Sequence, residues 1–252
     1  MPDSALPETS ATTGTPATSG APAAPVSALP AAGLPAAVLF DMDGTLVDTE
    51  QLWWQTAAEL AEELHRPLTD EDAPEVLGQA VEHTAAHLHK VSGTTLDEAA
   101  LAARLGDSFA AKVAAETVPR PGALALLASL RDARVPTALV SASPRRVVDL
   151  VLSAIGRNWF AVTLAAEDTE RTKPAPDPYL AAAERLGLDP AVCLAVEDTP
   201  TGVASATAAG CAVLAVPSTA VPMPQGERIT LLASLEQADL ALLGKLSAAR
   251  GV

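Results

Sequence analysis

Short apolar runs alternate with amphipathic helical segments through the C-terminal half of the sequence, and this alternation constrains the fold most. A predicted helix over Ala123–Arg131 precedes an apolar strand over Thr137–Val140, and another helix is expected from Pro144. Further strands are predicted over Val192–Val196 and Ala212–Val216, with helical segments between them. Because consecutive parallel strands need a crossover, this order is typical of a parallel sheet with helices on both faces. We therefore predict an α/β fold, a Rossmann-like doubly wound parallel sheet.

An earlier apolar run, Val38–Phe40, leads directly into Asp41, Met, Asp43 and Gly44. The run is predicted to be a buried strand, and Gly44 has the backbone freedom to turn sharply away from it. In an open parallel sheet, ligands bind at the carboxyl ends of the strands. Two carboxylates held together there repel each other unless a cation lies between them or one is protonated. Such a pair can bind a hard metal ion, supply a nucleophile or carry out acid–base catalysis.

The segment between these two regions is helical in pattern and contains no predicted strand. Trp53, Ala57, Leu60 and Leu64 fall at helical spacing, and further helical segments extend to about Glu116. We therefore predict a helical cap over residues 50–117, inserted into an α/β core formed by residues 37–49 and 118–252. Residues 1–36 are rich in Ala, Pro, Ser and Thr, and we expect a disordered leader there.

The charge of the chain limits its partners. The 252 residues include 31 acidic and 16 basic side chains, for a formal net charge of −15. This charge repels nucleic acids and anionic membranes, so we expect neither as a partner, and an anionic small substrate would need a local positive charge. Cys193 and Cys211 show no metal-binding spacing and no disulfide framework, which favours the reducing cytoplasm. The sequence gives no indication of the oligomeric state.

Three predicted helices begin with a capping residue followed by proline: Ser143–Pro144, Asp177–Pro178 and Thr199–Pro200. A side-chain oxygen at the N-cap and a proline at the first helical position are both favourable. Two of these helices follow predicted strands directly, so their N-termini should point to the sheet edge that carries Asp41 and suit an anion there.

Polar side chains also follow each predicted strand or lie in nearby loops. Taken singly, each has an ordinary explanation as a turn residue, a capping hydroxyl, a surface lysine or an acidic loop. Their joint occurrence at successive strand ends is what indicates a functional site. The candidate residues are Asp41, Asp43, Thr45, Ser141, Lys173, Glu197 and Asp198.

In this order and context, the segments resemble the four motifs of the haloacid dehalogenase-like superfamily. The first runs from Asp41 as Asp-Met-Asp-Gly-Thr-Leu-Val-Asp, and Ser141 after Thr-Ala-Leu-Val matches the second. Lys173 begins the third, Lys-Pro-Ala-Pro-Asp-Pro-Tyr, and Glu197 begins the fourth, Glu-Asp-Thr-Pro-Thr-Gly. The resemblance covers about residues 37–217. The helical insertion after the first motif resembles the α-helical (C1) cap of the superfamily. This cap type is found in the branch that contains the phosphoglycolate phosphatases and β-phosphoglucomutases.

The resemblance implies a role for each candidate residue. Asp41 would be the nucleophile that forms an aspartyl-phosphate, and Asp43 would protonate the leaving oxygen and then activate water. Mg²⁺ would be the cofactor, held by Asp41, Asp198 and Asp43, the last through its backbone carbonyl, with Glu197 binding directly or in support. Lys173 would neutralise charge and restrain Asp41. The phosphate-binding residues would be Thr45, Ser141, Ala142 and Lys173, with the backbone N–H groups of Met42 and Ala142.

Within this branch, the residues favour a phosphatase of a small phosphorylated metabolite, of the sugar-phosphate or phosphoglycolate type. Thr45 directly after Gly44 is the form usual in phosphatases. The segment Gly78–Glu82 lacks the cap arginine of the mutases, and Trp53 stands where they carry a histidine. The helix over residues 50–64 also lacks the Schiff-base lysine of phosphonatases. A hexose-phosphate mutase is the alternative, and a non-catalytic binding module is the third reading.

The predicted cap also carries two adjacent tryptophans and three histidines. Trp53 and Trp54 point about 100° apart on a helix, so one of them can face the active-site cleft, and Trp53 is the stronger candidate. His83, His87 and His89 have no Cys or carboxylate that completes a convincing metal site, so we expect an exposed helix there.

Overall fold

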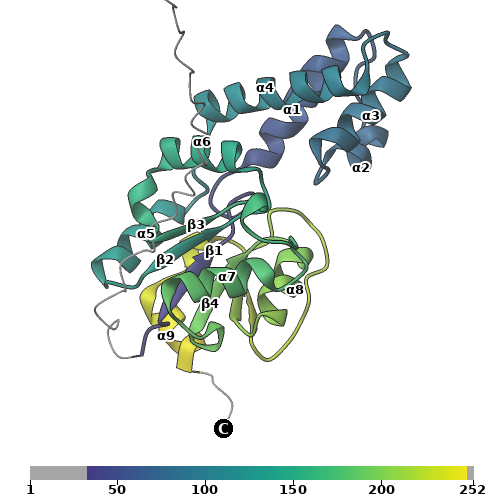
Figure 1. Ribbon diagram of the computed structural model, residues 1–252. Coiled ribbons are helices and arrows are strands. Elements are labelled where there is room, and N and C mark those ends of the chain that lie inside the picture. The colour runs from purple at the N-terminus through teal and green to yellow at the C-terminus, as the bar shows by residue number, and fades with distance from the viewer. Residues whose placement is uncertain (1–32, 249–252) are drawn as a thin grey trace, which may run out of the picture.

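The computed structural model describes residues 33–248 (Figure 1). The predicted disordered leader therefore lies outside the described residues, except for residues 33–36. Six strands form one parallel sheet in the order β3–β2–β1–β4–β5–β6. The strands are β1 Ala37–Phe40, β2 Thr137–Val140, β3 Val162–Leu164, β4 Cys193–Glu197, β5 Ala212–Ala215 and β6 Ile229–Leu231.

Helices cover both faces of this sheet, which confirms the predicted doubly wound fold. Alternate side chains of β1 point to opposite faces, so that Val38 and Phe40 join one hydrophobic cluster and Ala37 and Leu39 join the other. The first cluster is completed by α5 Ala123–Asp132, α6 Arg145–Ile155 and α9 Leu240–Ala248, and the second by α7 Asp177–Leu186 and α8 Pro200–Ala208. The three strands predicted in the C-terminal half occur within one residue of their expected bounds. β3 and β6, three residues each, are too short for a sequence pattern.

Only one of the three predicted proline caps is correct. Thr199 caps α8, which begins at Pro200, and its hydroxyl accepts a hydrogen bond from the Gly202 N–H at 3.0 Å. The other two predictions are wrong. Helix α6 begins one residue after Pro144, because the Ser143 hydroxyl donates a hydrogen bond to Asp43 and does not cap the helix. Helix α7 begins at Asp177 itself, and the Asp177 carboxylate accepts a hydrogen bond from Arg171 at 3.0 Å.

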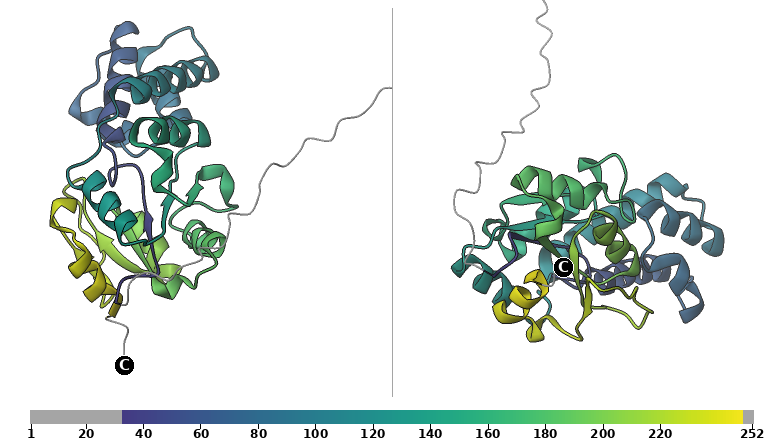
Figure 2. Two further views of the ribbon diagram at one scale, coloured as in Figure 1. Left: turned by 90° about the vertical axis from the view of Figure 1, so that its left-hand side faces the viewer. Right: turned by 90° about the horizontal axis from the view of Figure 1, so that it is seen from below.

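Helices α1–α4 form a separate layer at one end of the molecule, beyond the sheet (Figures 1 and 2). They are α1 Thr49–Glu63, α2 Ala73–Val76, α3 Val81–Ser92 and α4 Glu98–Glu116, and we call them the helical layer. The layer has its own apolar cluster, which includes Ala57, Leu60, Leu88, Leu101 and Leu105. It is therefore packed internally and does not rely on the sheet for its core.

The chain enters and leaves the helical layer at adjacent points. Val47, just before α1, forms an antiparallel bridge with Pro119, just after α4, and the Arg120 N–H donates to the Leu46 carbonyl at 2.8 Å. Helix α4 also packs against α6 of the main body. Phe109 of α4 contacts both the cluster of the layer and that of the main body. The two connecting segments and Phe109 therefore fasten the helical layer to the sheet.

Trp53 belongs to the interior of the helical layer, so it is not the cleft-facing member of the tryptophan pair, and the preference for it over Trp54 is wrong. Its indole N–H donates to the Val76 carbonyl at 2.8 Å, and its ring packs edge-on against Phe109 with centroids 5.1 Å apart. Trp53 lies on the same helical stripe as Ala57 and Leu60, and that stripe is buried. The neighbouring Trp54 is half-buried and lies on another side of α1.

Asp72 is a buried carboxylate at the start of α2 that ties the helical layer together. Only 4% of the residue is exposed. It accepts hydrogen bonds from the Thr69 N–H at 2.8 Å and from His87 Nε2 at 2.8 Å, and it contacts Arg66 at 3.4 Å. The Thr69 backbone hydrogen bond, with help from His87 and Arg66, lowers the pKa of Asp72 to about 2. His87 thus pairs with a carboxylate of its own layer.

No helix in residues 33–248 is both long and apolar enough to cross a membrane.

We predict that Phe109→Ala loosens the helical layer from the main body. Removing a partly buried aromatic ring should cost about 1–3 kcal/mol of unfolding free energy, measured by urea denaturation. Tryptophan fluorescence should report the change strongly, because Trp53 and Trp54 both lie in α1. Phe109→Leu should recover most of the loss. A midpoint equal to that of the wild type would contradict the fastening role of Phe109.

A second prediction concerns the pH dependence of the helical layer. A carboxylate whose pKa is depressed on folding stabilises the protein above its unfolded pKa, about 3.9, and that stabilisation disappears as pH falls through the folded value. For Asp72, whose folded pKa is about 2, the stability difference between wild type and Asp72→Asn should be largest above about pH 4 and should shrink towards pH 2. Urea midpoints of both proteins across this range test it, with the exposed Glu71→Gln as control. A difference that is constant with pH would contradict the assignment.

Candidate active site

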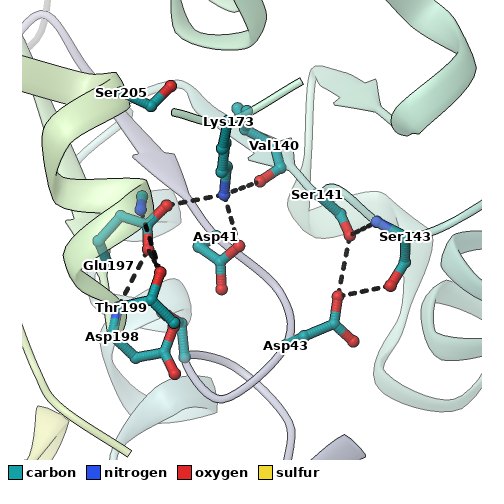
Figure 3. Close-up of polar contacts among 12 residues, drawn as sticks. Asp41, Asp43, Val140, Ser141, Ser143, Lys173, Glu197, Asp198, Thr199 and Ser205 are labelled. Carbon is teal, nitrogen blue, oxygen red and sulfur yellow. Dashed lines mark hydrogen bonds and ion pairs between the residues drawn. The ribbon is translucent and has the colours of Figure 1, made fainter. Parts of the chain in front are cut away.

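Lys173 and Asp41 form a buried ion pair at the carboxyl ends of the central strands (Figure 3). Asp41 is the first residue after β1, and its N–H donates to the Val196 carbonyl of β4 at 2.9 Å. The Lys173 Nζ donates to Asp41 Oδ1 at 2.6 Å, to Glu197 Oε1 at 2.7 Å and to the Val140 carbonyl at 2.9 Å. Both side chains of the pair are less than a tenth exposed. The ammonium therefore has three oxygen partners, which offset the cost of burying its charge.

The electrostatics of this site are dominated by its carboxylates. Burial acts to lower the pKa of the Lys173 ammonium, but Asp41 and Glu197 outweigh it and hold that pKa above its ordinary value. Burial, together with repulsion from Glu197 and Asp198, raises the pKa of Asp41 despite the attraction of Lys173. Lys173 therefore stays charged, and the surrounding negative charge favours a further cation.

Glu197, the last residue of β4, holds Lys173 in place. Besides Lys173, its Oε1 accepts from the Tyr179 hydroxyl at 2.6 Å, and its Oε2 accepts from the Asp198 N–H at 3.2 Å. A Cβ on Gly202, in the first turn of α8, would overlap the Glu197 carboxylate. The glycine at position 202 therefore lets helix α8 approach Glu197 closely.

Asp198, the residue directly after β4, is also a buried carboxylate. Its Oδ1 accepts from the Thr45 hydroxyl at 3.4 Å and its Oδ2 from the Ser218 hydroxyl at 2.5 Å. Burial raises the pKa of Asp198 to about 7. Gly44 has a φ of +83°, and a Cβ there would overlap Asp198 Oδ2, so both its backbone conformation and its lack of a side chain are used.

The acidic residues of the site fit a hard metal ion. Oxygen atoms of Asp41, Glu197 and Asp198 all lie within 4.8 Å of one another, and in residues 33–248 this is the one such cluster of three. Asp41 Oδ2 is buried and has no hydrogen-bond partner, which is costly unless a cation binds it. Carboxylate oxygens are the ligands that Mg²⁺ uses in proteins. Glu197 already binds Lys173 and Tyr179, which leaves Asp41 and Asp198 as the side chains with the most capacity for a metal.

The carboxylate of Asp43 lies apart from this cluster and has its own hydrogen-bond donors. Its carboxylate accepts from Thr49 at 2.6 Å, Ser141 at 3.0 Å and Ser143 at 2.8 Å. Figure 3 shows it pointing to these serines, away from the contact between Lys173 and Asp41. Three hydroxyl donors therefore satisfy the Asp43 carboxylate.

The predicted phosphate-binding residues do not all belong to one hydrogen-bond network. Ser141 donates to Asp43 and accepts from the Ser143 N–H at 2.9 Å, and Ala142 lies between them, exposed. Thr45 is buried and its hydroxyl donates to Asp198. The structure therefore links Asp41, Thr45, Lys173, Glu197 and Asp198 through one polar network and gathers Asp43 and Ser141 in a second.

Five polar residues of these networks were not among the predicted site residues: Thr49, Ser143, Tyr179, Thr199 and Ser218. Ser218 had a sequence signal, since it lies just beyond an apolar strand, as Ser141 does. Tyr179 lies within the third motif. Ser143 was predicted only as a helix cap, and Thr49 lies just before the predicted cap helix. Only the folded chain brings their hydroxyls to Asp43.

Comparison with known proteins agrees with this fold. The family model described as haloacid dehalogenase-like hydrolase matches residues 35–210, so the chain belongs to that family of hydrolases. Hexitol phosphatase A of Escherichia coli (strain K12) is 37% identical over 203 residues, which are 79% of this chain and 91% of that protein.

Two solved structures resemble most of the described region. CbbY from Rhodobacter sphaeroides, in complex with phosphate, is 27% identical with a TM-score of 0.69 and covers 81% of this chain and 96% of its own. A haloacid dehalogenase family hydrolase from Deinococcus radiodurans, with bound phosphate and sodium, is 28% identical with a TM-score of 0.67 and covers 85% and 98%.

We predict that Gly202→Ala destabilises the protein, against the usual trend. Replacing a helical glycine by alanine normally stabilises by about 0.4–1 kcal/mol. Here the new methyl group would displace Glu197 and disturb Lys173, so we expect a loss of about 1–3 kcal/mol in calorimetry. The exposed neighbour provides the control, since Thr201→Ala should leave stability nearly unchanged. A Gly202→Ala protein as stable as the wild type would show that Glu197 does not pack there.

Proposed function

We propose that the chain is a Mg²⁺-dependent phosphatase of a small phosphorylated metabolite, of the sugar-phosphate or phosphoglycolate type, and that it works through an aspartyl-phosphate intermediate. The observation that carries the proposal is Asp41: one oxygen is held by Lys173 at 2.6 Å, and the other is buried without a hydrogen-bond partner. A carboxylate held in this way is oriented and still free to react.

In the proposed first step, the Asp41 carboxylate attacks phosphorus, and the bond from phosphorus to the leaving oxygen breaks. Asp43, in its acid form, gives its proton to that oxygen, so the leaving group departs as an alcohol. In the second step Asp43 takes a proton from water, the water oxygen attacks phosphorus, and the bond to Asp41 breaks. Inorganic phosphate leaves and the Asp41 carboxylate is restored.

Asp43 must reorient to perform this role. Its carboxylate accepts hydrogen bonds from Thr49, Ser141 and Ser143. We propose that rotation towards Asp41 exchanges these partners for the leaving oxygen of the substrate. Ser141 and the N–H of Ala142 are then available for the phosphoryl oxygens, together with Lys173 and, once released from Asp198, Thr45.

The metal in this proposal is Mg²⁺, bound by Asp41, by Asp198 and by the backbone carbonyl of Asp43, with Glu197 in support. When bound, the ion neutralises charge on the phosphoryl group. The raised pKa values of Asp41 and Asp198 are consistent with a site that needs a cation to hold both carboxylates ionised. We also propose that residues 50–117 act as the cap and residues 37–49 and 118–252 as the core. The two cysteines without a disulfide framework favour the cytoplasm.

The relatives support a phosphatase of small metabolites, since one of them is named a hexitol phosphatase. A hexose-phosphate mutase remains the alternative, because it would use the same nucleophile and acid. It predicts return of the phosphoryl group to the sugar. A binding module without catalysis explains neither the reactive oxygen of Asp41 nor the paired Lys173.

The test is phosphate release from a panel of small phosphomonoesters by the metal-depleted protein, with and without added Mg²⁺. Activity should depend on the ion, and Asp41→Asn should lower kcat by about 1,000-fold or more, because the nucleophile is lost. Asp132→Asn, an exposed aspartate on α5, is the matched control. Full activity of Asp41→Asn would disprove the nucleophile assignment, and conversion of a sugar 1-phosphate to the 6-phosphate without phosphate release would favour the mutase.

A further inference from the structure

A cleft of about 550 Å³ lies between the helical layer and the main body. Residues from both parts line it: Trp54, Asp70 and Leu77 come from the helical layer, and Arg120 and Ser218 from the main body. Ser218 also donates to Asp198 at 2.5 Å, so one end of the cleft reaches the acidic cluster of the active site. The leaving group of a substrate bound at Asp41 would therefore extend into this cleft.

Negative charge predominates in the wall of the cleft. Three carboxylates line it, those of Asp48, Glu50 and Asp70, against one guanidinium, that of Arg120. Glu50 is half-buried, and its pKa is raised by burial and by repulsion from Asp43 and Asp48, despite a hydrogen bond from the Gly78 N–H. The whole chain adds to this field with its formal charge of −15. A second anionic group on the substrate would meet repulsion here.

The remaining wall suits a neutral, hydroxyl-bearing group. Trp54 offers a half-buried aromatic ring beside the partly exposed Leu77, and such surfaces pack against the C–H face of a carbohydrate chain. Carboxylates accept hydrogen bonds from hydroxyl groups, and the Arg120 guanidinium donates them. The Arg120 side chain forms no ion pair in the described part of the chain, so its donors are available.

We infer that the cleft selects a phosphomonoester whose leaving group is a neutral polyol or sugar, and that it disfavours bisphosphates and phosphorylated carboxylic acids. This inference rests on the proposed phosphatase function and narrows its substrate class. The carboxylates and Arg120 bind the hydroxyl groups, and Trp54 and Leu77 pack against the carbon chain. A site with polar groups placed for hydroxyls rejects analogues that cannot pair with them.

The first experiment compares glucitol 6-phosphate with fructose 1,6-bisphosphate and 2-phosphoglycolate. We expect kcat/KM for glucitol 6-phosphate to exceed that for either of the others by about tenfold or more. Equal or higher kcat/KM for fructose 1,6-bisphosphate or 2-phosphoglycolate, each with a second anionic group, would overturn the inference. Acetyl phosphate, whose leaving group is too small to cross the cleft, separates this failure from failure of the proposed function, because a protein that is not a phosphatase should raise phosphate release from none of the four above the protein-free rate.

The second experiment tests the wall itself. Trp54→Ala should lower kcat/KM for glucitol 6-phosphate about tenfold more than kcat/KM for acetyl phosphate, mainly through KM, and Trp54→Phe should restore most of the loss. Asp70→Lys should raise the ratio of fructose 1,6-bisphosphate to glucitol 6-phosphate activity by about fivefold, because it reverses one charge of the wall. The control is Glu71→Lys, the same charge change on an exposed neighbour outside the cleft lining. Equal ratios in the Asp70 and Glu71 variants would contradict the role of the wall.

Discussion

The buried ammonium of Lys173 is the interaction on which the site depends. It stands among oxygens from three different strands: Asp41 after β1, the Val140 carbonyl of β2 and Glu197 of β4. Each carboxylate would be costly to bury alone, and so would the lysine. Together they fix the spacing of the three central strand ends. The order β2–β1–β4 in the sheet is what brings these groups to one point.

In the same arrangement, the carboxylate that holds Lys173 in place is a different one from the carboxylate that we propose reacts. Glu197 is saturated by Lys173, Tyr179 and the Asp198 N–H, so it fixes the lysine. Asp41 is held through one oxygen only, and its other oxygen has no partner. Asp43 is held by three hydroxyls in a separate group. Three carboxylates close in sequence or space therefore have three different environments, and we propose that these correspond to three different tasks.

Much of the fold could be predicted because its signals are local. The strand Thr137–Val140 is a run of β-forming and apolar residues bounded by Pro136 and Ser141, and it was predicted without error. Thr199 caps α8 through a bond to a residue three positions away, which the sequence also indicates. Ser143 failed as a cap because its hydroxyl bonds to Asp43, 100 positions away in the chain. Trp54, which lines the cleft, was passed over for Trp53, although Trp53 shares the buried stripe of Ala57 and Leu60. A partner distant in sequence decided the case of Ser143, whereas the helical spacing of Trp53 with Ala57 and Leu60 already indicated that Trp53 is buried.

The paired connections of the helical layer have a consequence for how the protein can change. The bridge between Val47 and Pro119 and the bond from Arg120 to Leu46 join the two ends of a segment of about 70 residues before it departs from the sheet. Because the two ends of this insertion lie next to each other, the insertion adds little to the free-energy cost of assembling the sheet. Its length and composition can drift, or be exchanged for those of another helical segment, while the strand order and the lysine cluster are left intact. Circular permutants opened within residues 49–116, and grafts of foreign helices between Val47 and Pro119, are therefore natural ways to rebuild this chain.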